Sequence, residues 1–385
     1  MNYEFTAEQQ AFRASVRKVF EHGASAARLR QLWDTETGRA ADLWDDLSTL
    51  GAPAILVPEE YGGLGGTELD LCPLLEESGW ACVPDALVEG LLAGPALLAE
   101  AATEEQKAKW LPGVARGSSR LTFALPGTRY VPDAHVSDLI ILGGRDEVRV
   151  YERDEVALAP VRSMDPARRL FTVTPRPGSG ARLPGGRAAL SRAESRIHAG
   201  SGAVLTGLAE RMLRMSVDHV KVRHQFGRPV GSFQAVKHLL AQATSLVTLA
   251  TRSVRSASCL LAQRAPHAQD AALLARICAV EAEFEANRVS LQTHGGIGFT
   301  FEHDLHLWLK RGKAMETAYG GHREPARRAG LLPMSGRHGV LTTQILGRSS
   351  PIRPQSRLSG LCGNGYMLLG VCLLLVGLVT GEAPA

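Results

Sequence analysis

The chain has 385 residues, of which 45% are hydrophobic, 21% charged and 5% aromatic, and its formal net charge is +4. These values are typical of a globular protein with two or three domains. The small net charge and the few aromatic residues argue against a nucleic-acid-binding protein. Six cysteines show no CxxC pair or zinc-ligand spacing, and MNYEFTAEQQ contains no secretory signal, so we expect a cytoplasmic protein with reduced thiols.

Residues 1–120 are predicted to form an N-terminal helical domain. Thr6 is placed to cap the first helix, with Gln9 completing a capping box, and Thr103 is placed to cap a later helix. Between them, YGGLGG at 61–66 has the composition of a phosphate-binding loop. No apolar strand precedes it and no GK[ST] follows it, so we interpret it as a structural turn.

The pattern changes to short β-rich runs in residues 121–194, which we assign to a reduced β domain. The runs are separated by Pro, Gly and Asp, and they read LTFAL, DLIIL, EVRVY, EVALAP and RLFTVT. They predict a small antiparallel sheet or barrel. The segment GSGARLPGG at 178–186 is placed in its final loop region.

Helical periodicity returns at about Ser195 and continues through residues 195–332. Apolar residues from Phe233 to Leu261 recur at i, i+3, i+4 and i+7. Further helices are predicted from near Gln269 to Gln292 and from about Asp304 to Tyr319, which together form a four-helix bundle. The fold class is therefore α+β, mainly α, with a small β domain between two helical domains.

Residues 333–385 form an atypical tail. It contains an apolar run, YMLLGVCLLLVGLV at 366–379, of about 14 residues, whereas a transmembrane helix needs roughly 17–25. The run is compatible with an interface anchor, a packing helix or an out-of-frame extension. We favour these over a spanning helix.

Two motifs lie in the predicted bundle. RHQFG at 223–227 precedes a long helix, and QTHGGIG at 292–298 follows another. Together with LWDDLSTLGAPAILVPEEYGGLGG near the N-terminus, they resemble the acyl-CoA dehydrogenase family. The resemblance spans roughly residues 3–330, and the two motifs are specific as a pair.

The resemblance implies FAD as cofactor. In the family the arginine of the first motif pairs with the FAD pyrophosphate, a task suited to a bidentate guanidinium. Its neighbours hydrogen-bond the phosphates and pack on adenine, and the motif glycines admit close backbone approach. These groups serve a neighbouring subunit, so an oligomer is implied. The candidate cofactor-binding residues are Arg223, Gln225, Phe226, Gln292, Gly295 and Gly296; the alternative is a solvated helix-end cation and a helix C-cap turn.

The catalytic base of the family has no obvious counterpart here. Family members remove an α-proton with a glutamate while a β-hydride passes to the flavin. The two positions that the family uses for this glutamate fall at Tyr319 and Gln263, and a tyrosine with a pKa near 10 is a poor base. Glu316 is a weak candidate, since we favour its alternative role as a partner of Lys313 or Lys310. The catalytic residue stays unassigned.

The β domain also departs from the family. The family's T-E-P-x-x-G-S-D loop is represented by TFALPG at 122–127, which lacks the acidic and Gly-Ser-Asp part. The family's W-x-[TS] strand has no counterpart, because no tryptophan lies between Trp110 and Trp308. The chain thus keeps contacts for a neighbour's FAD and loses those for its own. The implied function is an acyl-CoA dehydrogenase subunit that supplies no base, acting in fatty acid or steroid side-chain β-oxidation.

The resemblance also implies partners. These are an acyl-CoA substrate, a paralogous subunit in an α2β2 assembly or else a homo-oligomer, and electron-transfer flavoprotein as acceptor. The alternative function is a non-catalytic scaffold or regulatory protein with the same fold; a DNA-associated relative ranks last. His294, His303 and His306 suggest a metal site, and His303 and His306 are predicted to share a helix face, but without a third ligand near in sequence we predict no metal site.

Overall fold

The computed structural model describes residues 4–320. Its N-terminal part is helical, as predicted. The elements are α1 (Ala7–Gly23), α2 (Ala26–Trp33), α3 (Ala41–Thr49), α4 (Glu68–Trp80), a π-helical turn (Val88–Ala93), α5 (Gly94–Ala101) and α6 (Glu104–Ala115). Capping boxes at Thr6 and Thr103 start α1 and α6, which confirms both predicted caps.

The glycine-rich segment 61–66 is a turn, as predicted. The N–H groups of Gly65 and Gly66 donate to the carbonyls of Val57 and Ile55 at 2.9 and 2.7 Å. A Cβ on Gly63 would lie 1.9 Å from the Val57 oxygen, so only glycine fits this crossing. The donors that a phosphate loop would offer to a ligand are used within the backbone.

Two small sheets follow. One has the order β1 (Leu121–Ala124), β3 (Leu139–Gly143), β4 (Val148–Glu152), β7 (Ala181–Leu183), and the other β2 (Val131–Pro132), β6 (Leu170–Pro175), β5 (Val156–Val161). All five predicted strands are present. The prediction was wrong in two respects: β1 and β3 pair in parallel, and the segment 178–186 contains β7 rather than only loop.

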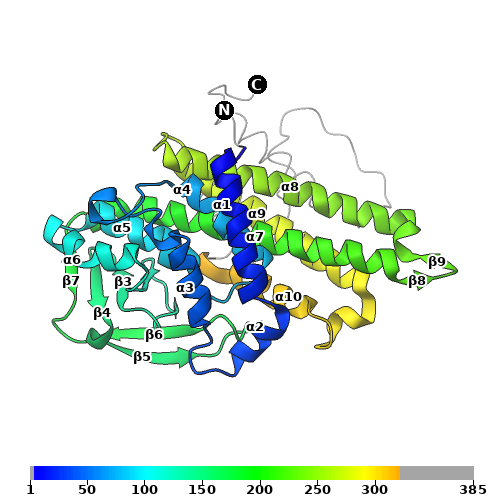
Figure 1. The fold of residues 1–385 in the computed structure, drawn as a ribbon, viewed down its shortest axis with the longest axis horizontal. Coiled ribbons are helices and arrows are strands. Elements are labelled where there is room, and N and C mark those ends of the chain that lie inside the picture. The colour runs from blue at the N-terminus through cyan, green and yellow to red at the C-terminus, as the bar shows by residue number, and fades with distance from the viewer. Residues whose placement is uncertain (1–3, 321–385) are drawn as a thin grey trace, which may run out of the picture.

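The C-terminal part is built on long helices: α7 (Gly186–Val222), α8 (Gln234–Ala262), α9 (Ala268–His294) and α10 (Leu305–Thr317). A short hairpin, β8 (His224–Gln225) and β9 (Arg228–Pro229), joins α7 to α8. α7 begins at Gly186, earlier than the predicted Ser195, and Gly186 packs on Val148, where a Cβ would lie 2.6 Å from that side chain. Figure 1 shows the sheets near one end of the molecule and the hairpin at the other.

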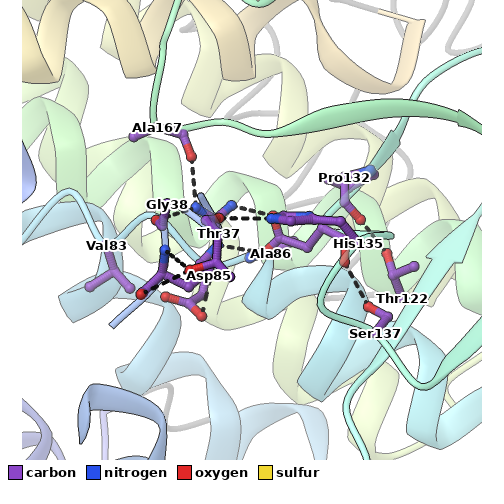
Figure 2. A network of polar contacts seen from close by, with 12 residues as sticks. Thr37, Gly38, Val83, Asp85, Ala86, Thr122, Pro132, His135, Ser137 and Ala167 are labelled. Atoms are coloured by element: carbon purple, nitrogen blue, oxygen red, sulfur yellow. Dashed lines mark hydrogen bonds and ion pairs between the residues drawn. The ribbon is translucent and has the colours of Figure 1, made fainter. Parts of the chain in front are cut away.

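A buried ionic network joins the N-terminal helices to the β-strands (Figure 2). Arg39 donates from Nε and Nη2 to the carboxylate of Asp133, and from Nη1 to the carbonyls of Gly38 and Ala167 at 2.7 and 2.9 Å. Asp133 also accepts from the backbone N–H of Ala86 at 2.8 Å. The network therefore fixes how the two parts of the chain meet.

None of the helices within residues 4–320 combines the length and the apolar composition that crossing a membrane requires. The tail 333–385, with its apolar run at 366–379, lies outside the described residues.

Candidate functional site

A cavity of about 1050 Å³ lies between the strands and the start of α7. The TFALPG segment forms one wall, and the last turn of α10 with residues 318–320 forms another. Its charged lining residues are four cations and one anion, Arg129, Arg145, Arg168, Arg187 and Glu194. The cavity is therefore shaped and charged for an anionic ligand of moderate size.

Tyr319, one of the two positions at which the sequence predicts the family's glutamate, stands in the wall of this cavity. Its hydroxyl donates a hydrogen bond to Glu89, and its backbone has a φ of 55°. Burial and the nearby carboxylate of Glu89 raise the pKa of Tyr319 far above its ordinary value. The phenol is therefore protonated at neutral pH and does not act as a base.

Glu89 is a residue that the sequence reasoning missed. It is 2% exposed, lies in the π-helical turn and borders a small pocket of about 30 Å³ shared with Tyr319 and Arg168. Burial raises the pKa of Glu89, while Arg168 and the bond from Tyr319 oppose that rise. One signal was available: Glu89 is a single acid within the apolar run ALVEGLLAGPALL.

Replacing Tyr319 with phenylalanine should lower the free energy of unfolding by about 1–3 kcal/mol, because the buried carboxylate of Glu89 loses its donor. Chemical denaturation of Y319F measures this. Y130F, which alters an exposed tyrosine in the same cavity, is the matched control. Equal stability of the two variants would contradict the assigned contact.

The other two candidate positions for a base lie away from the cavity lining. Glu316 accepts a hydrogen bond from Lys313 at 2.7 Å, the partner that we favoured from the sequence. Gln263 is exposed at the C-cap of α8 and donates to the sulfur of Cys259 at 3.3 Å. Within residues 4–320, neither Glu316 nor Gln263 contributes to the cavity wall.

The RHQFG motif forms the hairpin that ends α7. Arg223 caps that helix, with its N–H bonded to the carbonyl of His219 at 2.9 Å, and its side chain is exposed. Phe226 is 90% exposed and has a φ of 53°. The β8–β9 hairpin that carries this motif projects beyond the ends of α7 and α8 (Figure 1).

The QTHGGIG motif lies at the same end of the molecule. Gln292, Gly295 and Gly296 are exposed, and nothing lies within 4 Å of a Cβ added to either glycine. Gln292 and Gly295 line a shallow cavity of about 300 Å³ with Arg288 and Phe299. The structure thus brings the two predicted motifs to one surface.

This surface lies far from the large cavity. Arg187, in the cavity, stands at the first turn of α7, and Arg223 follows its last residue. A helix of 37 residues at a rise of 1.5 Å is about 55 Å long. A single dinucleotide cannot bridge the two ends within one chain.

The histidines considered for a metal site lie in two separate groups of rings, and His303 precedes α10 rather than sharing a face of it with His306. His306 contacts the rings of Trp33 and Phe301, whereas His303 contacts His294. In the described part of the chain, no group of three or more histidine, cysteine or acidic side chains is arranged to hold a metal ion.

Comparison with known proteins identifies the family. Residues 6–118 match the acyl-CoA dehydrogenase N-terminal domain, and residues 190–329 match the C-terminal domain. The acyl-CoA dehydrogenase IpdE2 of Mycobacterium tuberculosis is 34% identical over 330 residues, covering 83% of this chain and 96% of that protein. FadE34 of the same species is 31% identical over 91% of this chain, which corresponds to 51% of FadE34.

Solved structures agree. The Tcur3481-Tcur3483 steroid ACAD G363A variant superposes with a TM-score of 0.77 at 27% identity, covering 84% of this chain and 96% of that one. The ChsE4-ChsE5 complex from Mycobacterium tuberculosis has a TM-score of 0.78 at 22% identity, covering 86% and 98%. The predicted three-part fold is confirmed, and the chain belongs to the acyl-CoA dehydrogenase family, oxidoreductases that act on CH–CH groups.

Proposed function

We propose that this chain is a subunit of an FAD-dependent acyl-CoA dehydrogenase that donates cofactor contacts to a paralogous subunit without supplying the catalytic base. One observation carries the proposal: the exposed donors at Arg223 and Gln225 lie beyond the end of α7, about 39 Å along the helix from Ile197, the last residue of α7 that lines the chain's own cavity. A flavin held by these donors must occupy a neighbouring chain.

The donor surface has the chemistry of an FAD site. Arg223 offers a guanidinium fork to a pyrophosphate, Phe226 offers an exposed ring to a planar base, and Gly295 leaves open space beside its backbone. When bound, FAD would supply the two-electron acceptor that dehydrogenation of an acyl-CoA requires. This chain's residues would hold and orient it.

In the described part of the chain, the cavity has a lining carboxylate at Glu194 but none at the positions predicted for the family's base. The hydroxyl of Thr122 is used in a 2.7 Å hydrogen bond to the Pro132 carbonyl, and Tyr319 is paired with Glu89. A second subunit would therefore supply the proton-abstracting carboxylate, while electron-transfer flavoprotein would accept the electrons.

The similar proteins support a two-subunit arrangement. One structure is described as a ChsE4-ChsE5 complex, and half the length of FadE34 lies outside its match to this chain. The Tcur3481-Tcur3483 structure is described as a steroid ACAD, which favours a steroid-derived acyl-CoA over a simple fatty acyl-CoA. We place the reaction in steroid side-chain degradation.

Co-purification tests the proposal. The chain would be prepared alone and with the acyl-CoA dehydrogenase encoded beside it, and flavin absorbance and dye reduction by acyl-CoAs would be measured. We expect flavin and turnover only in the complex. Full flavin occupancy and turnover from the lone chain would overturn the subunit assignment.

The alternative is a non-catalytic scaffold or regulatory protein with this fold. The Tyr319–Glu89 pair favours it, because that pair fills the base position with a protonated phenol. A complex that assembles but carries no flavin would select this alternative.

A further inference from the structure

Three imidazole rings meet where the two motifs come together. They belong to His219 on α7, His294 at the end of α9, and His303 in the loop before α10. The centroids of His219 and His294 are 4.6 Å apart with an interplanar angle of 26°, and those of His294 and His303 are also 4.6 Å apart. We call these residues the histidine cluster.

The histidine cluster connects the backbone segments that carry the cofactor donors. Arg223 lies one helical turn after His219 and bonds to its carbonyl. Gln292 and Gly295 flank His294 in sequence. One turn further into the bundle, Ser216 Oγ donates to Ser290 Oγ at 2.9 Å, so α7 and α9 are already fixed there. The rings lie between this hydrogen bond and the exposed donors.

The surroundings of the histidine cluster favour neutral rings. His294 is 5% exposed, its Nδ1 lies 2.8 Å from the Ser290 carbonyl oxygen, and its Nε2 has no hydrogen-bond partner in the described part of the chain. Burial lowers the pKa of His294 to about 4, and burial also lowers that of His219. The neighbouring rings and the Arg223 cation act in the same direction.

Nearby acidic side chains do not offset this lowering of the pKa values of His294 and His219. Asp218 on α7 pairs with Arg214 at 3.3 Å, and Asp304 pairs with Arg30 of α2 at 2.5 Å. On α9, Glu285 pairs with Arg288 at 2.6 Å, and Glu302 in the loop is exposed. On α10, the neighbouring titratable residue is His306, whose ring packs against Phe301 and carries no negative charge. A proton added to the histidine cluster is therefore disfavoured by the nearby Arg223 cation and by any other protonated ring.

We propose that the histidine cluster positions the cofactor donors: while its rings are neutral it holds together the end of α7, which leads to Arg223, and the end of α9, which carries Gln292, and when they are protonated the two segments separate and FAD is released. This inference rests on the proposed function for the identity of the ligand. The geometric part, a pH-sensitive contact between α7 and α9, stands independently of it.

The direction of the pH effect follows from linkage. The pKa of His294 is depressed in the closed arrangement, so the closed form binds fewer protons than the open one below pH 6.5. Its stabilising contribution is complete above pH 6.5 and is lost as pH falls through about 4. FAD retention should follow the same window.

The test compares FAD binding by the purified complex between pH 7.5 and 5, using flavin fluorescence. The wild type should lose affinity by on the order of tenfold or more across this range. H219F/H294F keeps two stacked rings without titratable nitrogens, so it should lose less than about threefold. H267Q, which alters an exposed histidine at the other end of α9, should behave as the wild type.

A second readout does not require flavin. The melting temperature of the wild type should fall more between pH 7.5 and 5 than that of H219F/H294F, and H219F alone serves if the double variant does not fold. Identical pH dependence of the wild type and the variants, in FAD binding or in melting, would overturn the inference. A complex that binds no FAD at pH 7.5 would instead count against the proposed function, and the melting comparison would still judge the histidine cluster.

Discussion

Replacement of Asp133 by alanine is expected to lower the free energy of unfolding by about 3–5 kcal/mol, since the buried guanidinium of Arg39 loses its hydrogen-bonded carboxylate and keeps only that of Asp85, at 4.0 Å. Arg39 is 7% and Asp133 is 6% exposed. The Ala86 N–H loses its acceptor in the same variant. Because Asp133 joins the strands to the N-terminal helices, the loss should appear in a single cooperative transition on urea titration.

The matched control is D42A. Asp42 also pairs with an arginine, Arg28, but its side chain is 61% exposed, so the change should be less than about 1 kcal/mol. D133N should recover part of the stability by keeping an acceptor for Ala86. If D133A and D42A were equally stable, the buried network would not hold the two parts of the chain together.

Replacement of Arg223 by alanine is expected to weaken FAD binding by the complex roughly 10- to 100-fold, the loss of about 1.5–3 kcal/mol typical of charge-assisted hydrogen bonds. Stability should change little, because the Arg223 side chain is exposed. R223K should restore only part of the affinity, since an ammonium lacks the bidentate fork. Fluorescence titration with FAD measures these differences.

Variants of two further arginines of α7 test where the flavin lies. Arg187 stands in the chain's own cavity at the start of α7, and Arg214 is an exposed residue paired with Asp218. If the flavin occupies the partner's cavity, R223A lowers its affinity while R187A and R214A do not. A loss in R187A comparable to that in R223A would place the cofactor in this chain instead.

Features set by neighbouring residues were predictable from the sequence. The capping boxes at Thr6 and Thr103, the five longer strands and the long helices all depend on residues within a turn or a strand length of one another. The start of α7 was not predicted, and its first residue, Gly186, packs on Val148, which is distant in sequence. The parallel pairing of β1 with β3 depends on topology in the same way.

The same distinction between local features and contacts between distant segments applies to the candidate site. Both cofactor motifs were visible as contiguous residues, and their roles stay predictions. The Tyr319–Glu89 bond joins residues 230 positions apart, and the Arg39–Asp133 pair joins residues 94 apart. Such partners are chosen by tertiary packing, and neither residue of either pair carries a local signal for the other. The histidine cluster was equally hidden, since its rings come from three segments.

The length of α7 has an evolutionary consequence. A single rigid helix puts the donors at one end and the cavity at the other, so substitutions at one end leave the geometry of the other unchanged. Under the proposed function, one copy that arose by gene duplication could therefore lose its cavity chemistry through a few substitutions and still supply Arg223 to its paralogue. Division of labour between paralogues needs no new fold here, only drift at one end of a helix.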